Sequence, residues 1–126
     1  MATVILMLSP RDPATKAALA TSLIAAVADG YQIPESRVNV FIQEFAPADR
    51  HGGRIEATVM VHALPRAIDL KRALVSNVAD AVARHIEAPR ERVNIMLIDT
   101  PWENSGVGGT LAVDKRAASA VPQAQS

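Results

Sequence analysis

Residues 3–11 read TVILMLSPR, and residues 58–66 read TVMVHALPR. The two stretches lie 55 positions apart, and the same shift aligns the rest of each half without a gap, from Thr3 to Glu44. About a third of the aligned positions are identical, and most others keep similar hydrophobicity. Self-similarity at a fixed period marks a repeated structural unit. We therefore interpret the chain as two copies of one unit, fused head to tail.

Each copy contains the pattern of a strand, a helix and a second strand. In the first copy, the continuous apolar run 4–8 has the length of a buried strand. Apolar residues at helical spacing then predict a helix over 13–31, and Gly30 with Pro34 is assigned to its end. A second strand is predicted over 38–42. The second copy repeats this order, with strand, helix and strand predicted at 57–63, 67–86 and 93–98.

This pattern predicts an α+β fold in which tandem β-α-β repeats share one sheet. Each crossover connects two parallel strands in the right-handed sense, so the two pairs form a four-stranded mixed sheet with both helices on one face. We predict a single domain over 1–114, made of repeats 1–54 and 55–114, and a flexible tail over 115–126. A glycine-rich segment after the last strand predicts a hairpin, with a short edge strand at 110–113.

The predicted strands are apolar on both sides, whereas two helices cover only one face of a sheet. Residues 4–8 and 95–98 are consecutive apolar runs. The second face must therefore be buried against another surface. An oligomer in which the sheets of several copies face one another satisfies this requirement.

Composition excludes several classes of function. The 126 residues include 13 basic and 13 acidic side chains, so no net field attracts nucleic acid or an anionic membrane. No cysteine is present, and the three histidines lack the spacing of a metal site, so we assign no metal. The chain begins with an apolar run that has no basic segment before it, which favours a strand over a signal peptide or membrane helix, and a cytoplasmic location.

Four features resemble the tautomerase superfamily, in the fused, double-length form of 4-oxalocrotonate tautomerase. They are the repeated β-α-β unit, the arginine after each first strand (Arg11 and Arg66), the Ala-Pro break before the last strand, and the Gly-Val-Gly-Gly segment at 106–109. The similarity covers residues 1–114. It implies the tautomerase (MIF-like) fold, a homotrimer with pockets between repeats and neighbouring chains, a small 2-oxo acid or its enol as substrate, and no cofactor.

The chain departs from the family at the catalytic base. Members of the superfamily use an amino-terminal proline, whereas this chain begins Met1-Ala2-Thr3. The ungapped match places Met1 at the position of that proline. If Met1 is removed, Ala2 offers a primary α-amine instead, one residue short of the usual reach. An unperturbed α-amine has a pKa of about 7.7–8 and accepts a proton near neutral pH, so Met1 and Ala2 are the candidate bases.

Arg11 and Arg66 stand where the resemblance implies a two-pronged contact with a substrate carboxylate. The alternative is an ordinary solvated loop arginine, and of the two, Arg66 is assigned to the pocket that includes the amino terminus. A second departure is Asn39 and Asn94, where 4-oxalocrotonate tautomerase carries a substrate-polarising arginine. Asparagine donates a hydrogen bond without charge. Both asparagines are candidate substrate ligands, or partners for neighbouring backbone groups.

Two functions remain open. The first is slow keto–enol tautomerisation of a small 2-oxo acid by an amine other than proline. The alternative is a non-catalytic trimeric scaffold or small-ligand binder that kept the fold. A decarboxylase, dehalogenase or hydratase of the same superfamily ranks last, because the sequence shows no further acidic or aromatic groups for those reactions.

Overall fold

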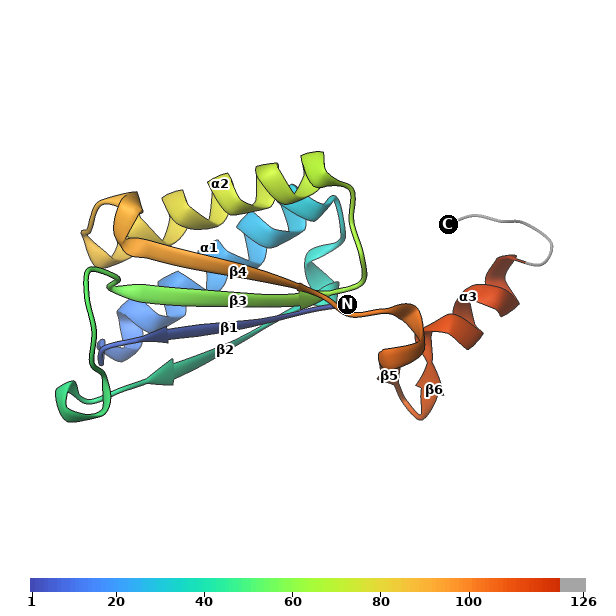
Figure 1. Cartoon of the computed structure of the whole chain (residues 1–126), viewed down its shortest axis with the longest axis horizontal. Helices are drawn as coiled ribbons and strands as arrows, with labels where there is room; N and C mark the ends of the chain where they lie inside the picture. Colours follow the sequence, from blue (N-terminus) through green and yellow to red (C-terminus); the bar gives the residue numbers. More distant parts are fainter. Residues whose placement is uncertain (121–126) are drawn as a thin grey trace.

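The computed structural model describes residues 1–120, and its main body is one sheet with two helices packed on it (Figure 1). The sheet has the strand order β2-β1-β3-β4. Its strands are β1 (Ala2–Leu8), β2 (Val38–Glu44), β3 (Ala57–Ala63) and β4 (Val93–Asp99). The pairs β1–β2 and β3–β4 are parallel, and the central pair β1–β3 is antiparallel. The predicted four-stranded mixed sheet is confirmed.

The two helices connect the parallel strands of each repeat and lie on the same face of the sheet (Figure 1). Helix α1 spans Pro13–Tyr31, and helix α2 spans Ile68–Ile86. The carboxylate of Asp12 accepts a hydrogen bond of 2.7 Å from the backbone N–H of Thr15, which satisfies one of the free donors at the start of α1. The two helices match the predicted ranges, 13–31 and 67–86, to within one residue.

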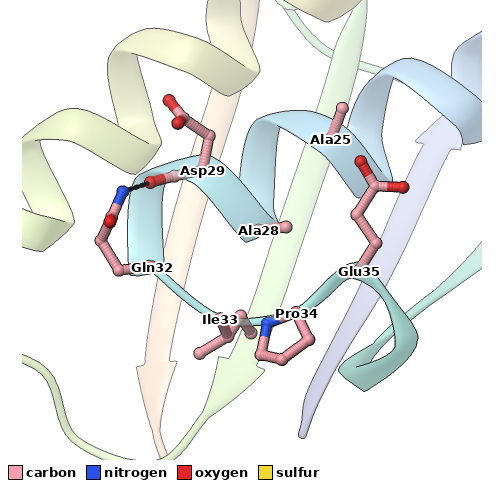
Figure 2. Close-up of a pocket in the computed structure, with 7 residues that line it drawn as sticks. All are labelled: Ala25, Ala28, Asp29, Gln32, Ile33, Pro34 and Glu35. Carbon is pink, nitrogen blue, oxygen red and sulfur yellow. Dashed lines mark hydrogen bonds between the residues drawn. The ribbon is translucent and has the colours of Figure 1, made fainter.

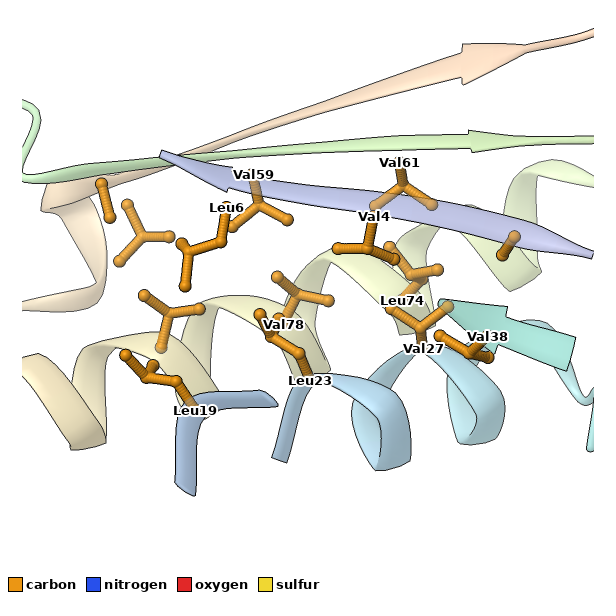
Figure 3. Close-up of a cluster of buried hydrophobic side chains, with 14 of the residues drawn as sticks. Val4, Leu6, Leu19, Leu23, Val27, Val38, Val59, Val61, Leu74 and Val78 are labelled. Carbon is orange, nitrogen blue, oxygen red and sulfur yellow. The ribbon is translucent and has the colours of Figure 1, made fainter. Parts of the chain in front are cut away.

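The core fills the space between the sheet and the helices (Figure 3). Along β1 and β3 every second residue is buried, as expected when one strand face packs against helices. The largest fully buried side chains are all aliphatic: Leu6, Leu8, Leu19, Leu23, Leu74, Val4, Val27, Val59, Val61, Val78 and Val82. A core almost without aromatic rings is what the composition predicted.

Gly30 is a contact residue between the helices, which corrects its predicted role in ending α1. A Cβ built on Gly30 would lie 2.5 Å from the Cα of Leu74. The helix ends instead at Gln32, whose φ of 57° is left-handed, and Glu87 ends α2 in the same way with φ of 55°. Glycine at residue 30 thus allows α1 and α2 to approach closely.

Replacing Gly30 by alanine should destabilise the protein, although alanine is the better helix former. The added methyl group must push α2 away, and we expect overpacking to exceed the gain in helix propensity by about 1–2 kcal/mol. Thermal unfolding followed by circular dichroism measures this change. Gly53→Ala is the control, because a Cβ there would meet no atom within 4 Å. A Gly30→Ala melting temperature equal to or above that of wild type would refute the packing role.

The sheet face opposite the helices, here called the open face, carries an apolar row across all four strands. The backbone register aligns Phe41, Ile5, Met60 and Met96 side by side. Phe41 is 60% exposed and Met96 is 50% exposed. More polar rows flank this middle row, one with Asn39, Thr3 and His62, the other with Gln43, Thr58 and Asn94. The monomer alone leaves this face uncovered.

After β4 the chain leaves the sheet and forms a small separate unit (Figure 1). It contains a 3-10 turn over Trp102–Asn104, the hairpin β5 (Gly106–Val107) and β6 (Thr110–Leu111), and helix α3 (Ala112–Ala120). Gly108 and Gly109 form the turn with φ of 63° and 87°, as the glycine pattern predicted.

The C-terminal segment departs from the predicted elements in two places. The predicted edge strand at 110–113 is shorter, because its last two residues belong to α3. The predicted flexible tail began at residue 115, but residues 115–120 continue α3, and residues 121–126 lie outside the described part of the chain. The Arg116 guanidinium lies over the Trp102 ring, 4.4 Å from its centre, and connects α3 to the turn before the hairpin.

Candidate active site

The antiparallel pairing of β1 and β3 brings the start of the chain beside the end of β3, the first strand of the second repeat. Ala2 pairs with both Val38 and Ala63, and Ala63 in turn pairs with Asp99. The residues just outside these pairs therefore gather where β1 and β2 begin and β3 and β4 end. We call this end of the sheet the amine end, and it comprises Met1, Tyr31, Arg37, Asn39 and Arg66.

The α-amino group of Met1 is the basic group of the amine end. Partial burial lowers its pKa, and the positive charges of Arg37 and Arg66 lower it further. A lower pKa leaves more of the amine neutral near pH 7, and only the neutral form accepts a proton. The shift therefore increases the share of the amine that can accept a proton. Ala2, the other candidate, is fully buried inside β1.

Arg66 is held on two sides. Its Nη1 donates hydrogen bonds to the carbonyl oxygens of Leu64 at 3.1 Å and Pro65 at 3.2 Å. Its guanidinium also lies over the ring of Tyr31, 5.3 Å from the ring centre. Burial raises the pKa of the Tyr31 hydroxyl, and the negative charge of Asp99 raises it further, while Arg66 opposes this shift. The phenol therefore stays neutral across the physiological range.

The side chain of Asn39 contacts the side chain of Met1 at the amine end. Its Nδ2 lies 2.9 Å from the Met1 sulfur, which is a weak acceptor. The asparagine side chain belongs to the open face, beside Thr3. Arg37 was not assigned from the sequence, although the repeated Arg-Val-Asn at residues 37–39 and 92–94 was a signal. Arg37 affects the pKa of the Met1 amine because the β1–β2 pairing brings the two residues together, and the sequence alone does not show this pairing.

The opposite end of the strands carries the equivalent residues of the other repeat. One charge differs in sign, because a carboxylate replaces the α-amine. Glu56 occupies the position of Met1, and its carboxylate forms an ion pair of 3.2 Å with Arg92, the equivalent of Arg37. Arg11 belongs to this end: its Nη1 donates to the Pro10 carbonyl at 3.2 Å. We call it the carboxylate end. It holds Arg11 and Asn94, which are therefore not brought together with Met1 inside one chain.

One ion pair is common to both ends. Lys16 contacts Glu44 at 3.3 Å, and Lys71 contacts Asp99 at 2.6 Å, each linking the first turns of a helix to the end of a strand. The backbone N–H of Arg11 also donates to the Glu44 carboxylate at 2.8 Å. Glu44 and Asp99 are thus structural partners of the lysines in both repeats.

A shallow depression lies elsewhere, beside the end of α1 (Figure 2). It is lined by Ala25, Ala28, Asp29, Gln32, Ile33, Pro34 and Glu35, none of which was predicted as a site residue. The Gln32 amide donates to the Asp29 carbonyl at 2.6 Å within it. Among residues 1–120, no three His, Asp or Glu side chains are grouped as metal ligands. No helix in the same range combines the length and apolar composition needed to cross a membrane.

Comparison with known proteins gives one family match and several similar proteins. A family model described as "Tautomerase enzyme" matches residues 58–115. A probable tautomerase of Listeria innocua is 39% identical over 49 residues, which are 39% of this chain and 80% of that protein. A probable tautomerase of Listeria monocytogenes serotype 4b matches with the same identity and coverage.

Solved structures match over nearly the whole chain. A native fused 4-OT superposes with a TM-score of 0.84 at 24% identity, covering 89% of this chain and 97% of that one. A second fused 4-OT, described as a symmetric trimer, gives a TM-score of 0.74 at 28% identity and covers 89% and 95%. The repeat, the sheet order and the matched sequences agree, and the chain belongs to the tautomerase family.

Proposed function

We propose that the protein catalyses keto–enol tautomerisation of a small 2-oxo acid, with its amino-terminal α-amine as the base. The observation that carries this proposal is the partly buried Met1 amine, whose pKa is lowered by that burial and by the charges of Arg37 and Arg66. A base with a pKa near the working pH combines a useful neutral fraction with adequate basicity. At the carboxylate end the equivalent position is occupied by Glu56, whose carboxylate is paired with Arg92.

The proposed reaction moves one proton within the substrate. The neutral amine removes the proton from the enol hydroxyl, which leaves an enolate and an ammonium group. The same ammonium then returns the proton to the carbon next to the carbonyl, which yields the 2-oxo form and restores the amine. The positive charges of Arg37 and Arg66 stabilise the negative charge that develops on oxygen between these two transfers.

We assign the substrate carboxylate to Arg66. A guanidinium binds a carboxylate through two parallel hydrogen bonds, and fixing it beforehand reduces the entropy lost on binding. We assign to Asn39 a further, uncharged hydrogen bond to the substrate, made from the open face. Arg11 and Asn94 are assigned the equivalent positions in a second pocket at the carboxylate end, where the negative charge of Glu56 opposes an anionic substrate.

The proposed assembly is a homotrimer that buries the open face. The middle row presents Phe41, Ile5, Met60 and Met96 together, and burying such a surface is worth about 25 cal/mol per Å². Similar fused 4-OT structures are described as trimers. Assembly would also cover the polar rows beside the middle row, which include Asn39 and Asn94.

The alternative function is a trimeric scaffold or small-ligand binder that has lost catalysis. Two observations favour it: a primary amine replaces the family proline, and the side chain of Met1 contacts Asn39 rather than leaving that asparagine free for a ligand. Such a protein would still bind a 2-oxo acid at Arg66, without turnover that depends on the amine.

Replacing Arg66 by alanine should lower kcat/KM for phenylenolpyruvate by about 10- to 100-fold, because a charge-assisted hydrogen bond is worth about 1.5–3 kcal/mol. Steady-state kinetics on the intact oligomer measure this loss. Arg11→Ala is the matched variant, since Arg11 occupies the equivalent position at the carboxylate end. We expect it to change kcat/KM by less than about threefold. Equal losses in the two variants, or none in Arg66→Ala, would contradict the assignment.

A further inference from the structure

We propose that Tyr31 is a positioning residue that fixes Arg66 for the substrate carboxylate, and that this aromatic ring makes the amine end the anion-binding end. The inference rests on the proposed function, because it gives Arg66 its ligand. Tyr31 is the last residue of α1 and only 3% exposed, so its ring is a rigid surface fixed by the core. The Arg66 guanidinium lies 5.3 Å from the centre of that ring.

Two kinds of contact restrict Arg66 in different directions. The carbonyl oxygens of Leu64 and Pro65 accept hydrogen bonds from its Nη1 and fix one corner of the guanidinium. The guanidinium carbon lies over the Tyr31 ring, where an arginine and an aromatic ring attract each other. A guanidinium held at one corner by two carbonyls and held over a fixed ring keeps its remaining N–H groups in a defined direction. This is the geometry that two-pronged carboxylate binding requires.

The other repeat provides a comparison within the same molecule. Arg11 is the equivalent of Arg66, and it makes the same bond to the preceding proline carbonyl, also at 3.2 Å. The residue equivalent to Tyr31 is Ile86, which is 9% exposed and also ends its helix. The position equivalent to Tyr31 therefore carries an aliphatic side chain, which offers Arg11 no aromatic ring. The ring distinguishes the two arginines, and it stands at the end that also holds the amine.

The role is assigned to the ring and not to the hydroxyl. The hydroxyl lies within the electrostatic influence of both Asp99 and Arg66. Asp99 is already paired with Lys71 at 2.6 Å, so its charge is largely compensated. Removing the hydroxyl while keeping the ring should therefore preserve the position of Arg66, whereas removing the ring should release it.

The experiment compares Tyr31→Phe, Tyr31→Leu and Tyr31→Ile in the full-length oligomer. The Ile variant introduces the residue that the other repeat carries. KM for phenylenolpyruvate and the dissociation constant of phenylpyruvate, from titration calorimetry, should rise about 3- to 30-fold in Tyr31→Leu and Tyr31→Ile, as expected for loss of a cation–π contact. The kcat should change much less, and Tyr31→Phe should remain within about twofold of wild type.

A purely structural role for Tyr31 is tested by Ile86→Ala, which removes core volume at the equivalent place in the other repeat. This variant should lower the melting temperature and leave KM and the dissociation constant unchanged. In the Arg66→Ala background, Tyr31→Leu should cause no further loss of affinity, because the group that it positions is already absent.

The outcomes separate this inference from the proposed function. Loss of affinity in Arg66→Ala with wild-type affinity in Tyr31→Leu would overturn the role of Tyr31 and leave the function in place. Equal losses in Tyr31→Phe and Tyr31→Leu would assign the effect to the hydroxyl and also overturn it. Unchanged affinity in Arg66→Ala would refute the proposed substrate contact, and the inference with it.

Discussion

Replacing Ile5 by aspartate should dissociate the proposed trimer into folded monomers. Ile5 lies near the centre of the middle row, paired on one side with Phe41 and on the other with Met60. Its side chain faces away from the helices, so the core of the monomer does not change. In the proposed trimer, however, each aspartate would bring an unpaired charge into an apolar interface, at a cost of several kcal/mol per copy.

Sedimentation velocity at micromolar concentration measures this effect, with circular dichroism to verify that the helices persist. The matched control is Ala25→Asp, which adds the same charge at an exposed position on α1. We expect Ala25→Asp to sediment as a trimer and Ile5→Asp as a monomer. An Ile5→Asp variant that stays trimeric, or a wild-type protein that is a stable monomer, would show that the open face is not the interface.

Blocking the α-amine should remove nearly all activity. A general base contributes about 10²–10⁴-fold to the rate, and burial with the charges of Arg37 and Arg66 lowers the pKa of the Met1 amine at this end. Carbamylation at mildly acidic pH modifies the amine with the lowest pKa first. Intact mass and peptide mapping would report the modified fraction, and the loss of activity should follow modification of residue 1 and not of Lys16 or Lys71.

Intact mass also determines which residue carries the amine. If Met1 is removed, the amine passes to Ala2, which lies within β1 and pairs with Val38 and Ala63. The amine would then be withdrawn by about 3.3 Å, the length of one residue in a strand. We expect the form that keeps Met1 to be the more active one. Full activity in a chain whose α-amine is quantitatively blocked would favour the scaffold or ligand-binding function.

The fold could be predicted because each local signal agreed with the repeat. Apolar runs of strand length and a proline after each helix occur at equivalent positions in both halves, and an aspartate before a proline marks the start of α1. Gly30 shows where such reasoning fails. Near the end of a helix it looks like a stop signal, but its equivalent is His85, and its actual role depends on Leu74 in the other helix.

The site was only partly predictable for the same reason. Arg66 and Met1 were assigned to one pocket by the resemblance. Tyr31 and Arg37 could not be assigned from the sequence. Arg37 becomes a neighbour of Met1 only through the β1–β2 pairing, and Tyr31 contacts Arg66 only when α1 packs against the sheet. Glu56 likewise gains significance only when it is seen at the position of Met1, bound to Arg92.

The most direct test of the proposed base is the pH dependence of kcat/KM, measured together with an NMR titration of the isotope-labelled α-amine. The base works only when neutral, so activity should rise with pH and reach a plateau above the pKa of the amine. Because burial and the charges of Arg37 and Arg66 lower that pKa, the midpoint should lie below the ordinary value of about 8. It should move upward in Arg37→Ala. Agreement of the kinetic and NMR midpoints in both proteins is the predicted result. A kinetic midpoint that differs from the titration of the amine, or that persists after the amine is blocked, would contradict the assignment of the base.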